Sequence, residues 1–67
     1  IEVAVPEDWQ GRSIGELDIR RKYGVNILGV KRNGNTDVNI SPETVLDADM
    51  TLLVLGENQE LKKHFRL

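Results

Sequence analysis

The pair Asn33-Gly34 is the feature that most limits how this chain can fold. Both residue types adopt positive φ angles readily, and the pair is typical of a tight turn between two antiparallel strands. It stands between two segments with apolar and β-branched residues, VNILGVKR over 25–32 and NTDVNI over 35–40. The sequence therefore predicts a β-hairpin, with the second strand ending before Pro42, which cannot donate to a strand ladder.

The length of the hairpin loop decides which side chains face each other. A loop of two residues would place Ile27 opposite Ile40 and Leu28 opposite Asn39. A loop formed by all of NGNT would shift this pairing, and the sequence alone leaves both registers open.

Two other segments have the composition of strands. The first, IEVAV over 1–5, alternates apolar and polar residues and ends at Pro6. The second, MTLLVLG over 50–56, is an unbroken apolar run. Such a run is typical of a strand buried on both faces, so we expect it in the middle of the sheet.

A helix is predicted over 13–24. Ser13 and Glu16 have the spacing of a capping box, in which each side chain binds a backbone N–H group of the other. Gly24 can end the helix in a left-handed conformation. The basic residues 20–22 lie near its carboxyl end, where positive charge complements the helix dipole.

The carboxyl-terminal segment 57–67 is predicted to form an amphipathic helix, with Leu61 and Phe65 one turn apart. Trp9 lies in a loop and is expected to cover the edge of the core. The predicted order is strand, helix, three strands and helix. This order indicates an α+β fold, with a small, mostly antiparallel sheet and both helices on one face.

Composition excludes several classes of protein. The 67 residues include 9 basic and 11 acidic ones, a net charge of -2, which argues against a nucleic-acid-binding protein. The chain has no cysteine, which excludes disulfides and thiolate metal sites. No apolar run approaches the roughly 20 residues of a membrane span. We expect one cytoplasmic domain and, because the chain begins at Ile1, a fragment of a longer protein.

The hairpin predicts a dimer. With a two-residue loop, Leu28 and Val30 lie on one face of the hairpin. The other face then carries Val25, Ile27, Gly29, Val38 and Ile40. Two short helices can cover only one face, and monomers rarely leave a large apolar patch exposed. A second copy of the chain, related by a two-fold axis, would cover the remaining face.

Polar residues beside these strands indicate a candidate ligand site. Lys31 and Arg32 follow the apolar residues of the first hairpin strand, and Asn39 lies on the returning strand. A dimer would bring two such sets together around an apolar floor, which fits a two-fold-symmetric ligand with flat rings and phosphates. The alternative is that Lys31 and Arg32 are solvated or protect a sheet edge.

No catalytic apparatus is recognisable in the sequence. Ser13 fits a helix cap, and Ser41, before a proline, fits a turn. Asp47 and Asp49 lack the further ligands that a Mg²⁺ or Ca²⁺ site needs. His64 is expected to pair with Glu60 on a helix surface. The glycines form no phosphate-binding loop motif.

The segments GRSIGELDIRRKYGVNILGVKRNG and SPETVLDADMTLLVLGENQEL together resemble a known family. It is the RCK-C, or TrkA-C, domain of proteins that control potassium conductance, and the resemblance is closest to the gating subunits of Ktr-type bacterial potassium uptake systems. It runs over nearly the whole chain, 1–67.

The resemblance implies a cytoplasmic regulatory domain that forms a homodimer and is not an enzyme. In the whole protein it implies a preceding domain that binds ATP, ADP or NAD, an octameric ring, and a potassium-translocating membrane subunit that holds the ring at the inner face of the membrane. In several family members cyclic di-AMP binds at the dimer interface and inhibits potassium uptake. The matching positions here are Ile27, Leu28, Lys31 or Arg32, Asn39, Ile40 and Pro42. A purely structural dimerisation module without a ligand is the alternative.

Overall fold

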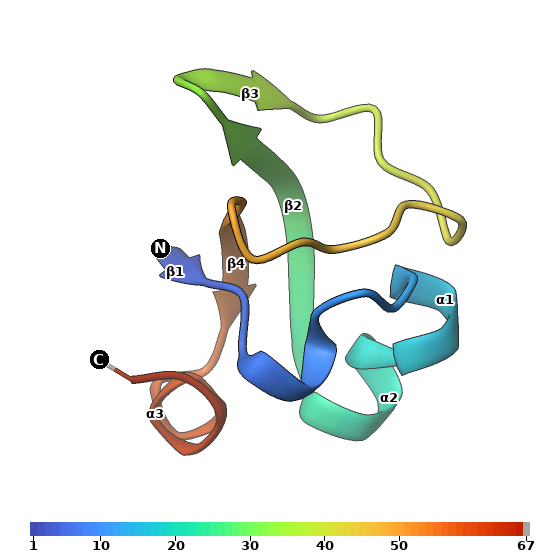
Figure 1. Ribbon diagram of the computed structural model, residues 1–67. Helices are drawn as coiled ribbons and strands as arrows, with labels where there is room; N and C mark the ends of the chain where they lie inside the picture. The colour runs from blue at the N-terminus through green and yellow to red at the C-terminus, as the bar shows by residue number, and fades with distance from the viewer. Residues whose placement is uncertain (67) are drawn as a thin grey trace.

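The computed structural model describes residues 1–66. Four antiparallel strands form one sheet in the order β1-β4-β2-β3 (Figure 1). The elements in chain order are β1 (Glu2–Ala4), the 3₁₀ turn η1 (Glu7–Trp9), α1 (Ile14–Leu17), α2 (Ile19–Tyr23), β2 (Val25–Arg32), β3 (Asn35–Asp37), β4 (Thr51–Gly56) and α3 (Asn58–His64). The predicted α+β fold with an antiparallel sheet is confirmed.

The hydrophobic core lies between one face of the sheet and the helices. Leu52 and Val54 of β4 are buried in it, while Leu55 on the opposite face is 59% exposed. The prediction that this strand is buried on both faces is therefore wrong for the single chain. The apolar run is central in the sheet, but the helices cover only its inner face.

Trp9 is at the centre of an aromatic cluster in this core. It is 2% exposed, and its ring lies 4.9 Å from that of Tyr23 and 5.4 Å from that of Phe65. Trp9 was expected to cover the edge of the core, and the structure instead encloses it within the core. The cluster joins the 3₁₀ turn η1 to the end of α2 and to the residue that follows α3.

The predicted helix over 13–24 is two short helices. Asp18 separates α1 from α2 in a left-handed conformation, with φ 49° and ψ 50°. Aspartate tolerates this conformation better than most residues, and the Asp18 carboxylate pairs with Arg21. Both predicted ends are confirmed, since Ser13 Oγ accepts a hydrogen bond from the Glu16 N–H and Gly24 ends α2 with φ 70°.

The hairpin has the predicted two-residue turn. Asn33 and Gly34 have φ angles of 52° and 79°, and Arg32 pairs with Asn35. The ladder ends at the pair Val30–Asp37. The predicted pairs of Ile27 with Ile40 and of Leu28 with Asn39 are therefore not formed, because β3 stops at Asp37 and the chain leaves the sheet.

A β-bulge at Leu28 changes the faces of β2. Ile27 pairs with Val54, whereas the next pair joins Gly29 to Leu53, so Leu28 is an extra residue. The extra residue brings Val30, opposite Leu52, to the same face as Ile27. The predicted division, with Ile27 and Val30 on opposite faces, is wrong for this reason.

The last helix is shorter than predicted. α3 ends at His64, and Phe65 is extended, with φ -127° and ψ 153°. Leu61 and Phe65 are both buried, as their spacing predicts. Leu67, at the end of the predicted helix, lies outside the described residues. Within residues 1–66 no helix is long and apolar enough to cross a bilayer.

Candidate functional site

A hollow of about 270 Å³ lies where the two short helices meet the start of β2. It brings together two of the predicted site residues, Ile27 from β2 and Pro42 from the connector 38–50 between β3 and β4. The hollow is lined by Ile14, Gly15, Asp18, Ile19, Arg20, Val25, Asn26, Ile27 and Pro42.

Hydrogen bonds to the first turn of α1 hold Pro42 in this position. The Gly15 N–H donates to the Pro42 carbonyl at 2.8 Å, and the Ile14 N–H donates to the Thr44 carbonyl at 2.9 Å. A Cβ at Gly15 would lie 3.0 Å from this carbonyl oxygen, so only glycine permits an easy approach. The connector therefore forms a fixed wall of the hollow.

The predicted apolar contacts differ in accessibility. Leu28 is 52% exposed at the bulge. Ile27 and Ile40 are partly buried and pack against the core of their own chain. Of these three aliphatic residues, Leu28 therefore offers the most surface to a ligand or to a second copy.

Asn39 lies in an exposed turn after β3. Its backbone N–H donates to the Asp37 Oδ1 atom at 2.8 Å, which turns the chain away from the sheet. The Asn39 side chain is exposed on the connector, between the end of β3 and Ile40. The amide predicted to contact a ligand is thus carried by a turn and not by a strand.

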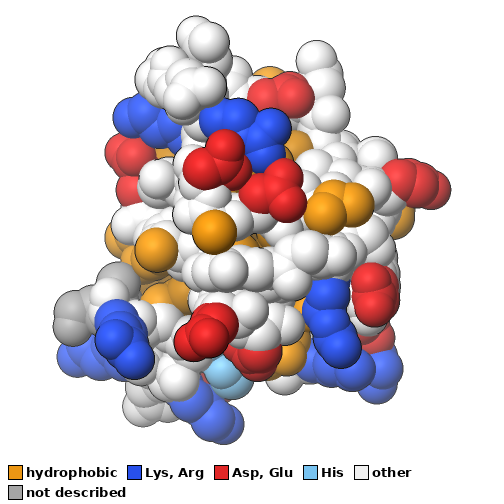
Figure 2. Space-filling view, viewed as in Figure 1, with side chains coloured by type: hydrophobic (Ala, Val, Ile, Leu, Met, Phe, Trp, Pro, Cys, Tyr) orange, Lys and Arg blue, Asp and Glu red, His pale blue; other side chains and the backbone are white. Residues whose placement is uncertain are grey.

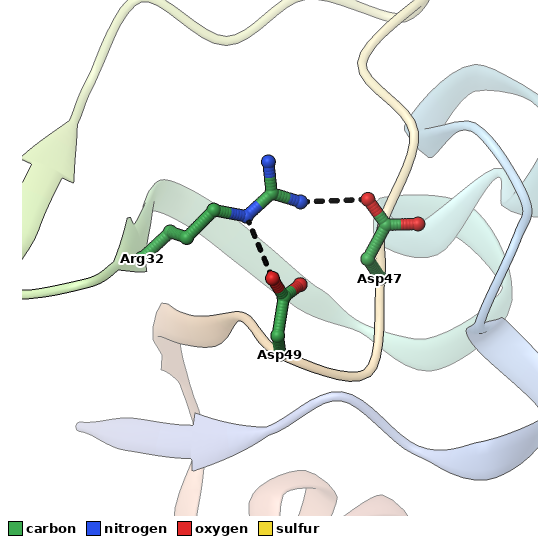
Figure 3. A network of polar contacts seen from close by, with 3 residues as sticks. All are labelled: Arg32, Asp47 and Asp49. Carbon is green, nitrogen blue, oxygen red and sulfur yellow. Dashed lines mark hydrogen bonds and ion pairs between the residues drawn. The ribbon is translucent and has the colours of Figure 1, made fainter.

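Both predicted phosphate-binding cations have acidic partners. Lys31 Nζ lies 3.4 Å from Glu2 Oε1. Arg32 lies between two carboxylates, with Nη2 2.6 Å from Asp47 Oδ2 and Nε 3.2 Å from Asp49 Oδ2 (Figure 3). Figure 2 shows basic and acidic side chains side by side at the hairpin end of the molecule, without a separate basic patch.

Sequence reasoning missed the partners of Arg32 and two polar residues of the hollow. Asn26 and Arg20 line the hollow beside Ile27. The sequence draws attention to Asp47 and Asp49 only as carboxylates with too few neighbours for a cation site. Antiparallel pairing of 25–32 with 51–56 could have placed them, because Lys31 pairs with Thr51 and brings Arg32 close to the residues before β4.

A larger hollow, of about 630 Å³, lies between β1 and the end of α3 and contains none of the predicted site residues.

Within residues 1–66 no three acidic or histidine side chains are grouped to hold a metal ion. Ser13 caps α1, and Ser41 Oγ accepts from the Glu43 N–H. His64 Nε2 lies 3.3 Å from Glu60 Oε2, which confirms the predicted pair, but the His64 side chain is only 18% exposed and not on the open surface.

Known proteins are similar to this chain in sequence and in fold. The family model of the TrkA-C domain matches residues 1–67. The K(+)/H(+) antiporter subunit KhtT of Bacillus subtilis (strain 168) is 35% identical over 54 residues, which are 79% of this chain and 33% of that protein. The chain thus spans about a third of that relative.

Two solved structures match with high TM-scores. The RCK C domain of the potassium transport protein KtrA, in complex with cyclic di-AMP, has a TM-score of 0.84 and 32% identity, over 94% of this chain and 74% of that one. The RCK_C dimer of S. agalactiae BusR with the same nucleotide has a TM-score of 0.80 over 96% and 86% of the two chains. At 21% identity the BusR match shows the fold alone. BusR has also been solved with promoter DNA. By sequence and fold, the chain belongs to the TrkA-C domain family.

Proposed function

We propose that this chain is the regulatory domain of a bacterial potassium transport system and that it senses cyclic di-AMP at a dimer interface. The observation that carries the proposal is the likeness to the KtrA domain solved with that nucleotide, at 32% identity over 94% of this chain. Regulation of transport requires the remaining two thirds of a protein of this kind, so the rest of the proposal concerns the whole protein.

The exposed face of the sheet supports a homodimer. Leu55 is 59% exposed on β4, Leu28 is 52% exposed at the bulge, and Leu53 is only half-buried. Exposed aliphatic side chains on a sheet without a covering layer are a typical protein-interaction surface. A two-fold axis beside β2 would bury these residues and bring two copies of the candidate site together.

Each copy would supply apolar and polar contacts to the ligand. Leu28, with the hollow that contains Ile27 and Pro42, fits a flat purine ring. Asn39 and Ile40 lie on the connector segment that leads to Pro42. Lys31 and Arg32 provide positive charge for phosphates. The proposed contacts are Ile27, Leu28, Lys31, Arg32, Asn39, Ile40 and Pro42.

In the whole protein we propose a cytoplasmic assembly at the inner face of the membrane. It would be an octameric ring, joined to a potassium-translocating membrane subunit, with ATP, ADP or NAD bound by a preceding domain. The present domain would need no further cofactor and bind no nucleic acid, in line with its net charge of -2. A nucleotide that prefers one arrangement of two protomers shifts their relative angle, and the attached domains would transmit this change to the pore.

Isothermal titration calorimetry with cyclic di-AMP tests the proposal. We expect one nucleotide per two chains. Leu28→Ala and Asn39→Ala should each weaken binding by about tenfold, the typical effect of removing one good contact. Lys62→Ala, an exposed change on α3, is the control and should bind like the wild type.

A dimerisation module without a small ligand is the second candidate. The observation that favours it is the pairing of Arg32 with Asp47 and Asp49, which occupies the cation best suited to a phosphate. A dimer by sedimentation that gives no heat with millimolar cyclic di-AMP would support this second candidate and refute nucleotide sensing.

A further inference from the structure

We propose that Asp47 and Asp49 are built-in competitors for Arg32, which lower its affinity for the phosphates of an anionic ligand. The proposal rests on the proposed function, because it concerns how the same site is regulated. It assigns the two aspartates a role in setting affinity for the ligand. The residues come from separate parts of the chain, Arg32 from the end of β2 and the aspartates from the connector (Figure 3).

The aspartates contact the side of the Arg32 guanidinium that a phosphate would bind. A guanidinium binds a phosphate most strongly in a bidentate manner, through Nε with one terminal nitrogen or through both terminal nitrogens. Nη2 belongs to both of these edges and carries two N–H groups, one of which donates to Asp47 Oδ2 at 2.6 Å. Nε lies 3.2 Å from Asp49 Oδ2 in an ion pair, so both carboxylates face the edge formed by Nε and Nη2. A phosphate that binds this edge must therefore compete with both aspartates.

The charges around Arg32 do not favour an anion while the aspartates are in place. Lys31 and Arg32 contribute two positive charges, and their partners Glu2, Asp47 and Asp49 contribute three negative ones. An approaching phosphate thus meets a surface that is not positive while the aspartates remain in place. Exposed pairs of this kind are weak enough to be exchanged, and the Arg32 side chain is 42% exposed and open to solvent.

Displacement of the aspartates by an anion would also affect the connector, because both residues belong to it. The connector that carries them also carries Asn39, Ile40 and Pro42, and it leads through the buried Met50 into β4. Ion pairs with Arg32 hold the last residues of the connector against the hairpin, while hydrogen bonds from α1 hold Pro42 and Thr44. An anion that displaces the aspartates would break only the ion pairs with Arg32, so binding would loosen the segment 47–49.

The test compares anion affinity in variants of equal net charge. Asp47→Asn with Asp49→Asn removes the competing charges and keeps the side-chain shapes. Calorimetry should show that this double variant binds cyclic di-AMP about three to ten times more tightly than the wild type, the effect of losing two exposed ion pairs. The control, Glu7→Gln with Glu57→Gln, makes the same change in net charge at exposed positions away from Arg32 and should bind like the wild type.

A second measurement observes Arg32 directly. The Arg32 Nε–H resonance in a ¹⁵N-labelled sample should shift on titration with inorganic pyrophosphate, at a lower concentration in the double variant than in the control. Arg32→Gln in the double-variant background should abolish the gain in affinity. Asp49→Asn alone, which leaves the shorter Asp47 contact intact, provides a milder variant if the double variant is unstable.

The outcomes separate the two proposals. If the wild type binds cyclic di-AMP and the double variant binds no more tightly than its charge control, the competition is refuted and nucleotide sensing stands. If no variant binds cyclic di-AMP but pyrophosphate ranks the variants as expected, nucleotide sensing is refuted and the competition stands. If neither probe distinguishes the double variant from its control, the competition is refuted.

Discussion

A Cβ atom at Gly29 would lie 2.9 Å from the carbonyl oxygen of Asp37. Gly29 immediately precedes Val30, whose pair with Asp37 is the last one in the hairpin ladder. The absence of a side chain at Gly29 therefore lets the chain pass close to β2 where it leaves the sheet. The exit of β3 in turn sets the path of the connector, and so the positions of Asn39, Ile40 and Pro42.

Gly29→Ala should destabilise the domain by about 1–3 kcal/mol, the usual cost of forcing an extra carbon into a filled space. The backbone at Gly29 does not have a positive φ, so the cost comes from the contact with Asp37 and not from the conformation of alanine. Urea unfolding measures the change. Asn26→Ala, on an exposed position of the same strand, is the control, and equal midpoints for both variants would contradict the argument.

The features that the sequence predicted correctly are set by local chemistry. The Asn33-Gly34 turn and the cap at Ser13 depend on a few adjacent residues; the turn formed as expected, and of the predicted capping box the bond from the Glu16 N–H to Ser13 Oγ formed. The break at Asp18 and the bulge at Leu28 depend on packing across the sheet and between helices. Gly29 is a local sign of the bulge, because a glycine within a strand often marks one, but no local pattern marks the break at Asp18.

The candidate site could be predicted only in part for the same reason. Ile27 and Pro42 were expected in one site, and the fold places both at one hollow. The pairing of Arg32 with Asp47 and Asp49 joins β2 to the connector, which local patterns do not reveal. It follows from the register of β2 with β4, which becomes known only when the sheet is assembled.

Phe65→Ala should lower the free energy of unfolding by about 3 kcal/mol or more, because it removes a buried aromatic ring. The ring packs edge-on against Trp9 at 5.4 Å between centroids. Trp9 is the only tryptophan of the chain, so its fluorescence reports the change during urea unfolding. Phe65→Leu, which keeps most of the volume, should cost about half as much or less. Equal losses in the two variants would refute a packing role.

Leu28→Asp should convert the proposed dimer to a monomer that remains folded. The side chain is 52% exposed in the single chain, so a charge there costs little in the monomer but is buried without a partner in the dimer. Ile40→Asp should also weaken the dimer, but Ile40 packs against its own core and its loss would destabilise the monomer as well.

Sedimentation equilibrium measures the dissociation of the Leu28→Asp dimer, and circular dichroism shows whether the fold is retained. Gln59→Asp introduces the same charge at an exposed position of α3 and should leave the mass unchanged. A Leu28→Asp protein that keeps the wild-type mass would place the interface elsewhere.

Ser13→Ala should destabilise the domain by about 0.5–1 kcal/mol, the typical loss for a helix N-cap. Ser13 Oγ accepts from the Glu16 N–H at 3.1 Å, while the Ile14 and Gly15 N–H groups donate to the connector. Loss of the cap should therefore loosen the first turn of α1 and, through it, the carbonyl contact that holds Pro42.

Hydrogen exchange of the Ile14 and Gly15 amides checks this connection. Both amides should exchange faster in Ser13→Ala than in the wild type, beyond the change in global stability. Ser13→Asp, which can also accept the Glu16 N–H bond, should restore the protection. Unchanged exchange at Gly15 in Ser13→Ala would show that the connector holds Pro42 without help from the cap, because the bond from Gly15 to Pro42 would then be independent of the first turn.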